Sequence, residues 1–286
     1  MTTTYASSPT RSVTAANGVS YAYRRLGTPA PDGTPVVFLQ HFRGNLDNWD
    51  PALIDRIAAG REVIAFDNVG IGATTGVTPG TVQQMAEDAV PFLDALGLGA
   101  VDLFGFSLGG FVAQALALAH PSRVRRLVLA GTGPQGAPGL SGWTDDVVER
   151  VVTKDAPGAE DVLYVFYAPT PASQQAGAAS LGRIFGERQE DRDADVSLEA
   201  KETQYRAVLD WGRPDWDAVA RLTTIGQPTL ILQGDDDIMV PTAASHTLAG
   251  LIPGARLVIY PDASHGSIFQ YAEQAAAETL SFLGEA

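Results

Sequence analysis

The feature that most constrains this chain is a serine flanked by glycines, where one apolar run meets another. Residues 101–106 have the apolar character of a buried strand, and the residues after Ser107 have that of a helix. A serine at such a junction sits on a tight turn that exposes its hydroxyl at the strand's carboxyl end. Gly105 and Gly109 remove the side chains that would block the turn. The pattern predicts that Ser107 is a nucleophile.

Composition restricts the partners and the chemistry of the protein. The 286 residues contain no cysteine, which excludes disulfides, a cysteine nucleophile and cysteine-based metal sites. The formal net charge is −14, and Lys154 and Lys201 are the two lysines. Such a surface repels nucleic acid and anionic membranes, so neither is expected as a partner. With no long apolar run and no signal-like start, the sequence predicts a cytoplasmic protein.

Apolar strand-like runs alternate with helix-like runs over most of the chain. The alternation predicts an α/β fold with a parallel sheet, antiparallel only at its N-terminal edge, where Asn17-Gly18 indicates a hairpin. The expected strands are residues 11–16, 19–26, 35–40, 62–67, 101–106, 126–130, 228–233 and 256–260. The expected helices outside the middle of the chain are residues 49–59, 82–96, 108–120, 243–251 and 269–283.

The middle of the chain breaks this alternation. From about residue 133 to 222 the sequence is mostly helical and carries many aromatic residues. We therefore divide the chain into a core of residues 1–132 and 225–286 and an inserted helical cap of residues 133–224. Aromatic residues in a helical block usually form core, but Trp143, Phe166 and Trp211 are candidates to line a substrate pocket.

A serine nucleophile needs a base, and the chain has four histidines. His120 stands at a helix end and His246 within a predicted helix, whereas His41 directly follows a strand. His265 lies between the last strand and the last helix, on the sheet edge where Ser107 is expected. His265 is therefore the predicted base, with an ordinary surface loop as the alternative.

The base in turn needs an orienting acid from another loop of that edge. Asp235, Asp236 and Asp237 follow a predicted strand, whereas the loop after residue 130 has no carboxylate. An acid hydrogen-bonded to the histidine would fix its tautomer and stabilise the imidazolium. A solvated acidic turn is the alternative.

These features together resemble the α/β-hydrolase fold family over nearly the whole chain outside the cap. The resemblance implies an eight-stranded, mostly parallel sheet flanked by helices. In that family the acid commonly sits in G-x-x-D-x-x-V-P, which selects Asp237 here, and Pro261 to His265 resembles the usual histidine loop. Asp67 begins a segment similar to the family's D-x-x-G-x-G loop, which implies a structural role.

The loop after the third strand departs from the family pattern H-G-x-x. Phe42 stands where a glycine is common, and the resemblance implies that the amides of Phe42 and Leu108 form an oxyanion hole. His41 and Arg43 in this loop are further candidates for the pocket. Arg43 would suit an anionic substrate group, but we expect it to pair with nearby carboxylates instead.

The sequence thus predicts a serine hydrolase that acts on a carboxylic ester or lactone. No metal or organic cofactor is expected. The alternatives are a cofactor-free haloperoxidase or perhydrolase, a C–C bond hydrolase, a proline-type aminopeptidase and a non-catalytic small-molecule receptor. The serine at position 107 argues against relatives that use an aspartate nucleophile. The sequence indicates no oligomeric state.

Overall fold

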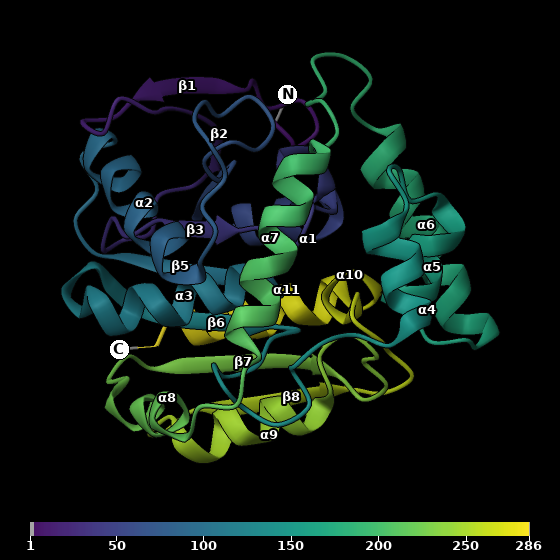
Figure 1. The fold of residues 1–286 in the computed structure, drawn as a ribbon. Helices are drawn as coiled ribbons and strands as arrows, with labels where there is room; N and C mark the ends of the chain where they lie inside the picture. Colours follow the sequence, from purple (N-terminus) through teal and green to yellow (C-terminus); the bar gives the residue numbers. More distant parts are fainter. Residues whose placement is uncertain (1–2, 286) are drawn as a thin grey trace.

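The computed structural model describes residues 3–285 and contains an eight-stranded sheet with helices on both faces (Figure 1). The strand order is β1-β2-β4-β3-β5-β6-β7-β8. The strands are β1 (Arg11–Thr14), β2 (Ser20–Gly27), β3 (Val36–Leu39), β4 (Glu62–Phe66), β5 (Val101–Phe106), β6 (Val124–Ala130), β7 (Thr229–Gly234) and β8 (Arg256–Tyr260). The predicted eight-stranded sheet is confirmed.

Strand direction also follows the prediction. β2 pairs antiparallel with β1 and with β4, and every other neighbouring pair in the described sheet is parallel. The hairpin turns at Gly18, whose φ of 80° suits a glycine. β3, β5 and β7 are buried along their whole length, as expected for parallel strands covered on both faces.

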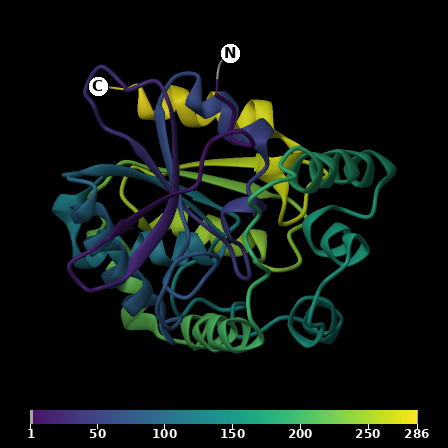
Figure 2. The same ribbon diagram turned by 90° about the horizontal axis from the view of Figure 1, so that it is seen from above.

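Two layers of helices cover the sheet (Figure 2). α1 (Pro51–Ala58) packs beside α11 (Ala272–Leu283) on one face, and α2 (Val82–Ala95), α3 (Leu108–Ala119) and α9 (Thr242–Leu251) lie on the other. The predicted helix 49–59 begins only at Pro51, because the Asp50 carboxylate caps it by accepting from the Ala52 amide. The predicted helix 269–283 is divided at Tyr271 into α10 (Ser267–Gln270) and α11.

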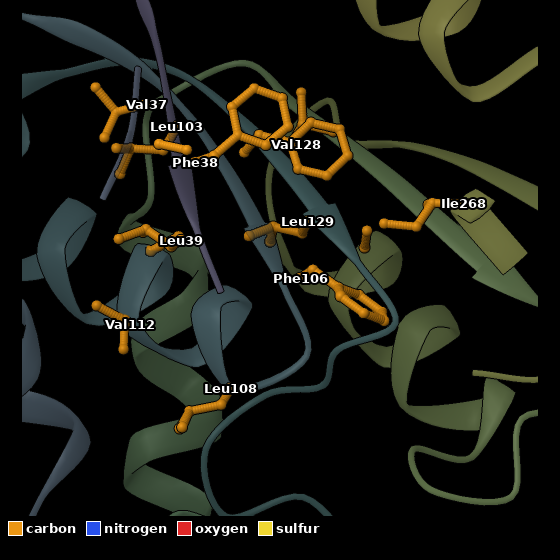
Figure 3. Close-up of a cluster of buried hydrophobic side chains, with 14 of the residues drawn as sticks. Val37, Phe38, Leu39, Leu103, Phe106, Leu108, Val112, Val128, Leu129 and Ile268 are labelled. Carbon is orange, nitrogen blue, oxygen red and sulfur yellow. The ribbon is translucent and has the colours of Figure 1, made fainter. Parts of the chain in front are cut away.

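The core lies between the sheet and these helices (Figure 3). Phe38 of β3 stacks on Phe104 of β5 with ring centroids 4.6 Å apart, and Trp49 meets Phe38 edge-on. Leu108 and Val112 of α3 are completely buried beneath the sheet. This packing holds the carboxyl end of β5 and the start of α3 in a rigid setting.

Helices connect β6 to β7, in the segment that the sequence assigns to the cap. They are α4 (Asp145–Val148), α5 (Ala159–Phe166), α6 (Pro171–Gly186), α7 (Leu198–Trp211) and α8 (Trp216–Arg221). An ion pair joins this segment to the core, because Arg183 of α6 lies 2.7 Å from the buried Asp50 carboxylate. Within residues 3–285, no helix has the length and apolarity needed to span a membrane.

Because α3 approaches β3 closely, one methyl group added at the point of contact should destabilise the fold. A Cβ added at Gly109 would lie 2.0 Å from the Leu39 carbonyl oxygen, so Gly109→Ala must displace backbone. We expect a loss of about 3 kcal/mol in the free energy of unfolding, measured by urea denaturation. As a control, Gly250→Ala in α9 meets open space and should be neutral or stabilising. Equal unfolding midpoints for the two variants would contradict this account.

Candidate active site

Ser107 occupies a strained turn between β5 and α3. Its φ of 56° and ψ of −118° are unfavourable for a residue with a side chain. The turn is held in place because the Ser107 amide donates to the Ala130 carbonyl at 2.8 Å. A Cβ at Gly105 would lie 2.4 Å from the Gly109 carbonyl oxygen, so glycine is required there. The side chain of Ser107 reaches a cavity under the cap.

His265 and Asp237 form a buried pair, and His265 lines the same cavity as Ser107. The Nδ1 atom of His265 lies 2.8 Å from Oδ2 of Asp237, and both side chains are almost inaccessible to solvent. The Asp237 carboxylate also accepts from the Met239 and Val240 amides and from the Gln233 side-chain amide. Because an ionised carboxylate only accepts, Nδ1 of His265 carries the proton, and Nε2 is left as the basic atom.

The structure separates Asp237 from its acidic neighbours. Asp235 and Asp236 are exposed, whereas Asp237 is buried against His265. Two other histidines take no part in this pair. The ring of His120 lies 3.0 Å from Glu87, and His246 is exposed on α9. The order of Ser107, Asp237 and His265 along the chain is the one predicted from the sequence.

Core and cap together enclose a cavity of about 170 Å³. Ser107, His265, His41, Phe42 and Arg43 line it from the core. Mostly apolar cap residues close it, among them Val151, Val162, Val165, Phe166, Leu181, Ile184 and Phe185. The cavity is therefore a small, mainly apolar chamber with a few polar groups at one wall, as is usual for a small-molecule site.

The candidate oxyanion donors lie on two elements of this wall. Leu108 is the first residue of α3, so its amide is one of the helix N-terminal amides that lack a partner within the helix. Phe42 follows β3 and lines the cavity next to Ser107. Both amides belong to segments whose backbone is fixed by the close approach of Gly109 to Leu39.

Of the three aromatic pocket candidates from the cap, Phe166 lines the cavity and two are placed elsewhere. Trp143 packs behind Phe42, with ring centroids 5.3 Å apart, and donates to the Met239 carbonyl. Trp211 stacks on Phe111 of α3 at 5.1 Å. Neither tryptophan is among the described residues that line this cavity. Both tryptophans were candidates only because they are aromatic. Residue type alone does not show whether a side chain of the cap faces the core or the cavity.

Arg43 departs from the expectation that it pairs with carboxylates. Its guanidinium donates to backbone carbonyls at one end of the cap, those of Val151, Lys154 and Asp155. Its own amide donates to the Gln204 side chain, and its φ is 62°. We name these contacts, between Arg43 and residues 151–155, the Arg43 clasp. The clasp fastens the loop after β3 to the cap.

Gln233 is a site residue that the sequence analysis did not single out. It is the last residue but one of the apolar strand β7, and its buried side-chain amide donates to Asp237 and to the Val240 carbonyl. The sequence feature that could have pointed to Gln233 is a glutamine at the end of an otherwise apolar predicted strand.

Asp67, predicted to be structural, accepts from the Leu46 amide behind the loop after β3. Within residues 3–285, no cluster of three or more histidine, aspartate or glutamate side chains is arranged to hold a metal ion.

The Arg43 clasp predicts a local change in flexibility. In Arg43→Ala three charge-assisted hydrogen bonds to the cap are lost, each worth about 1.5–3 kcal/mol. We expect amide hydrogen exchange in residues 41–45 and 151–156 to accelerate by about tenfold or more. Arg213→Ala is the control, since that side chain is mostly exposed and pairs only with Asp210. Unchanged exchange in both segments would show that the clasp does not hold them.

Comparisons with known proteins agree with the fold. A model of the alpha/beta hydrolase fold family matches residues 34–271. A solved alpha/beta hydrolase fold protein from Chitinophaga pinensis is 38% identical, with a TM-score of 0.91 over 99% of this chain and 100% of that protein.

The names of two similar proteins state different chemistries. A non-heme haloperoxidase of Rhodococcus erythropolis is 29% identical over 284 residues, which are 95% of this chain and 98% of that protein. A 2-hydroxymuconate semialdehyde hydrolase of Pseudomonas putida is 31% identical over 245 residues, which are 79% and 78% of the two chains.

Proposed function

The chain belongs to the α/β hydrolase fold family, and on that premise we propose that it is a serine hydrolase that cleaves a small carboxylic ester or lactone. The observation that carries this function is one cavity lined by both Ser107 and His265, with His265 held by the buried Asp237. A serine on a strained turn, a histidine with a free Nε2 and an orienting carboxylate are the parts that acyl transfer requires.

The reaction would begin with attack of the Ser107 hydroxyl on the substrate carbonyl. His265 Nε2 takes the hydroxyl proton, and the resulting imidazolium is stabilised by Asp237, which remains ionised. The amides of Phe42 and Leu108 donate to the negative oxygen of the tetrahedral intermediate. His265 then returns the proton to the leaving alkoxide, and an acyl-enzyme on Ser107 remains.

Water then hydrolyses the acyl-enzyme, and the same groups assist this second step. His265 removes a proton from the water as it attacks the acyl carbonyl. The second tetrahedral intermediate then collapses, the bond from the acyl carbon to Ser107 Oγ breaks, and His265 returns the proton to Oγ as the acid is released. Because His265 must be neutral in both steps, activity should fall as the pH is lowered. The hydrogen bond from Nδ1 to Asp237 would hold the neutral imidazole in the required tautomer at the start of each step.

The polar groups of the cavity favour an uncharged ester over a muconate-like acid. The guanidinium of Arg43 is committed to three cap carbonyls, so it does not offer a free cation to a substrate carboxylate. Perhydrolysis is the second candidate, because the haloperoxidase relative covers nearly the whole chain. Bromination that depends on both peroxide and a carboxylic acid, measured beside ester hydrolysis, would separate the two.

The nucleophile can be tested by covalent labelling. A fluorophosphonate should add once to the wild-type protein, on the peptide that contains Ser107, because only a serine activated by a base attacks it readily. Ser107→Ala should show no adduct by mass spectrometry, whereas Ser281→Ala, at an exposed position of α11, should label as wild type does. Folded wild-type protein that does not react would instead favour a receptor.

The role of the acid can be tested by an isosteric change. Asp237→Asn would present an amide to His265 and favour the wrong imidazole tautomer, so we expect kcat for ester hydrolysis to fall by about 10⁴-fold. Asp236→Asn is the matched control, because its side chain is exposed, and its kcat should change by less than about twofold. Comparable rates for the two variants would remove Asp237 from the mechanism.

A further inference from the structure

The cavity contains a second imidazole, that of His41, to which the reaction above gives no role. His41 is half-buried and directly follows β3. Its Nδ1 lies 2.8 Å from the Phe42 carbonyl oxygen. Because a carbonyl only accepts, Nδ1 must carry the proton, and the Nε2 atom of a neutral His41 is left as an acceptor. The tautomer of His41 is thus set by its own loop.

The ring of His41 lies at the reaction centre. It packs edge-on against Phe106 and Phe166, with centroids 5.3 and 5.4 Å away. The ring of His265 packs on the same two phenylalanines at 5.0 and 5.4 Å. Nε2 of His41 makes no hydrogen bond to any of residues 3–285, and the surrounding protein does not enclose it. His41 thus brings an acceptor without a protein partner among the described residues to the lining of the cavity that Ser107 also lines.

Two observations show that the side chains at this wall of the cavity offer no free cation, and the one carboxylate among the described lining residues is that of Asp195. The pKa of His41 is lowered to about 4, chiefly by burial and in smaller part by the neighbouring His265, although the hydrogen bond to Phe42 opposes the shift. His41 is therefore neutral near pH 7. The nearby guanidinium of Arg43 is already used in the Arg43 clasp. The cavity offers a neutral acceptor where an anionic substrate would need a cation.

We propose that His41 determines specificity by accepting a hydrogen bond from a hydroxyl on the acyl part of an uncharged ester or lactone. This deepens, and rests on, the hydrolase function proposed above. The acyl side is favoured because Phe42, next to His41, carries the amide proposed to bind the carbonyl oxygen. The cavity suits a small acyl group, since its volume of about 170 Å³ is close to that of a cavity that binds benzene, about 150 Å³.

Binding to an inactive variant tests this role without turnover. Ser107→Ala would be titrated calorimetrically with phenyl 2-hydroxybutyrate, phenyl 3-hydroxybutyrate and phenyl butyrate. We expect at least one hydroxylated ester to bind about three- to tenfold more tightly than the butyrate, as one added hydrogen bond provides. Phenyl hydrogen succinate, the anionic counterpart, should bind more weakly than the butyrate.

Paired substitutions at His41 identify the acceptor. In Ser107→Ala/His41→Asn the shorter amide keeps a donor for the Phe42 carbonyl but has no atom at the position of Nε2, so the preference for a hydroxyl should disappear. His41→Gln in the same background reaches that position with an oxygen and should restore part of the preference. The ratio of dissociation constants within each variant cancels any general loss of affinity.

Several outcomes would overturn the role of His41. Equal affinities for the three butyrates in Ser107→Ala, no binding of any of them, or a hydroxyl preference that survives His41→Asn each exclude it. Tighter binding of the succinate excludes the uncharged substrate. Failure of the hydrolase function is seen separately, as a wild-type protein that folds but takes no fluorophosphonate on Ser107.

Discussion

The close backbone approach between the start of α3 and the end of β3 is the constraint on which the site depends. Gly109 lies so near the Leu39 carbonyl that a methyl group would overlap it, and Gly105 lies as near to Gly109. This contact permits the strained backbone of Ser107 and brings the first amide of α3 toward the loop that carries Phe42. Strain of about 1–3 kcal/mol at such a residue persists only where the surroundings over-determine it. Here the fully buried strands β3 and β5 provide those surroundings.

A second constraint is that a buried carboxylate, that of Asp237, must receive hydrogen bonds. Asp237 is removed from water, which would be costly for an unpaired charge. Two backbone amides, the Gln233 side chain and His265 together supply its hydrogen bonds, so the carboxylate is tolerated and its orientation is set. The same bonds fix the position of the His265 ring. The core thus holds the acid and the imidazole rigidly before any substrate arrives, as preorganised catalysis requires.

The cap contributes in a different way, through the shape and charge of the cavity. Its side chains form the apolar wall, and its backbone carbonyls occupy the guanidinium of Arg43. An arginine beside a reactive serine would ordinarily favour anionic substrates. Because the Arg43 clasp directs that guanidinium to backbone carbonyls, the cavity offers a substrate no free cation, and His41 is one of the polar side chains that remain. Specificity in this protein would therefore arise where the loop after β3 meets the cap.

The sequence by itself determined the sheet, its strand directions and the loops that carry Ser107, Asp237 and His265. Those features follow from local chemistry: the period of apolar residues, the glycines around a turn and the order of loops along one sheet edge. Only the tertiary structure decided that Phe166 faces the cavity while Trp143 and Trp211 pack elsewhere. It also decided that Arg43 binds carbonyls more than 100 residues away and not carboxylates. Such contacts depend on how the cap docks on the core, and no local pattern in the sequence records that arrangement.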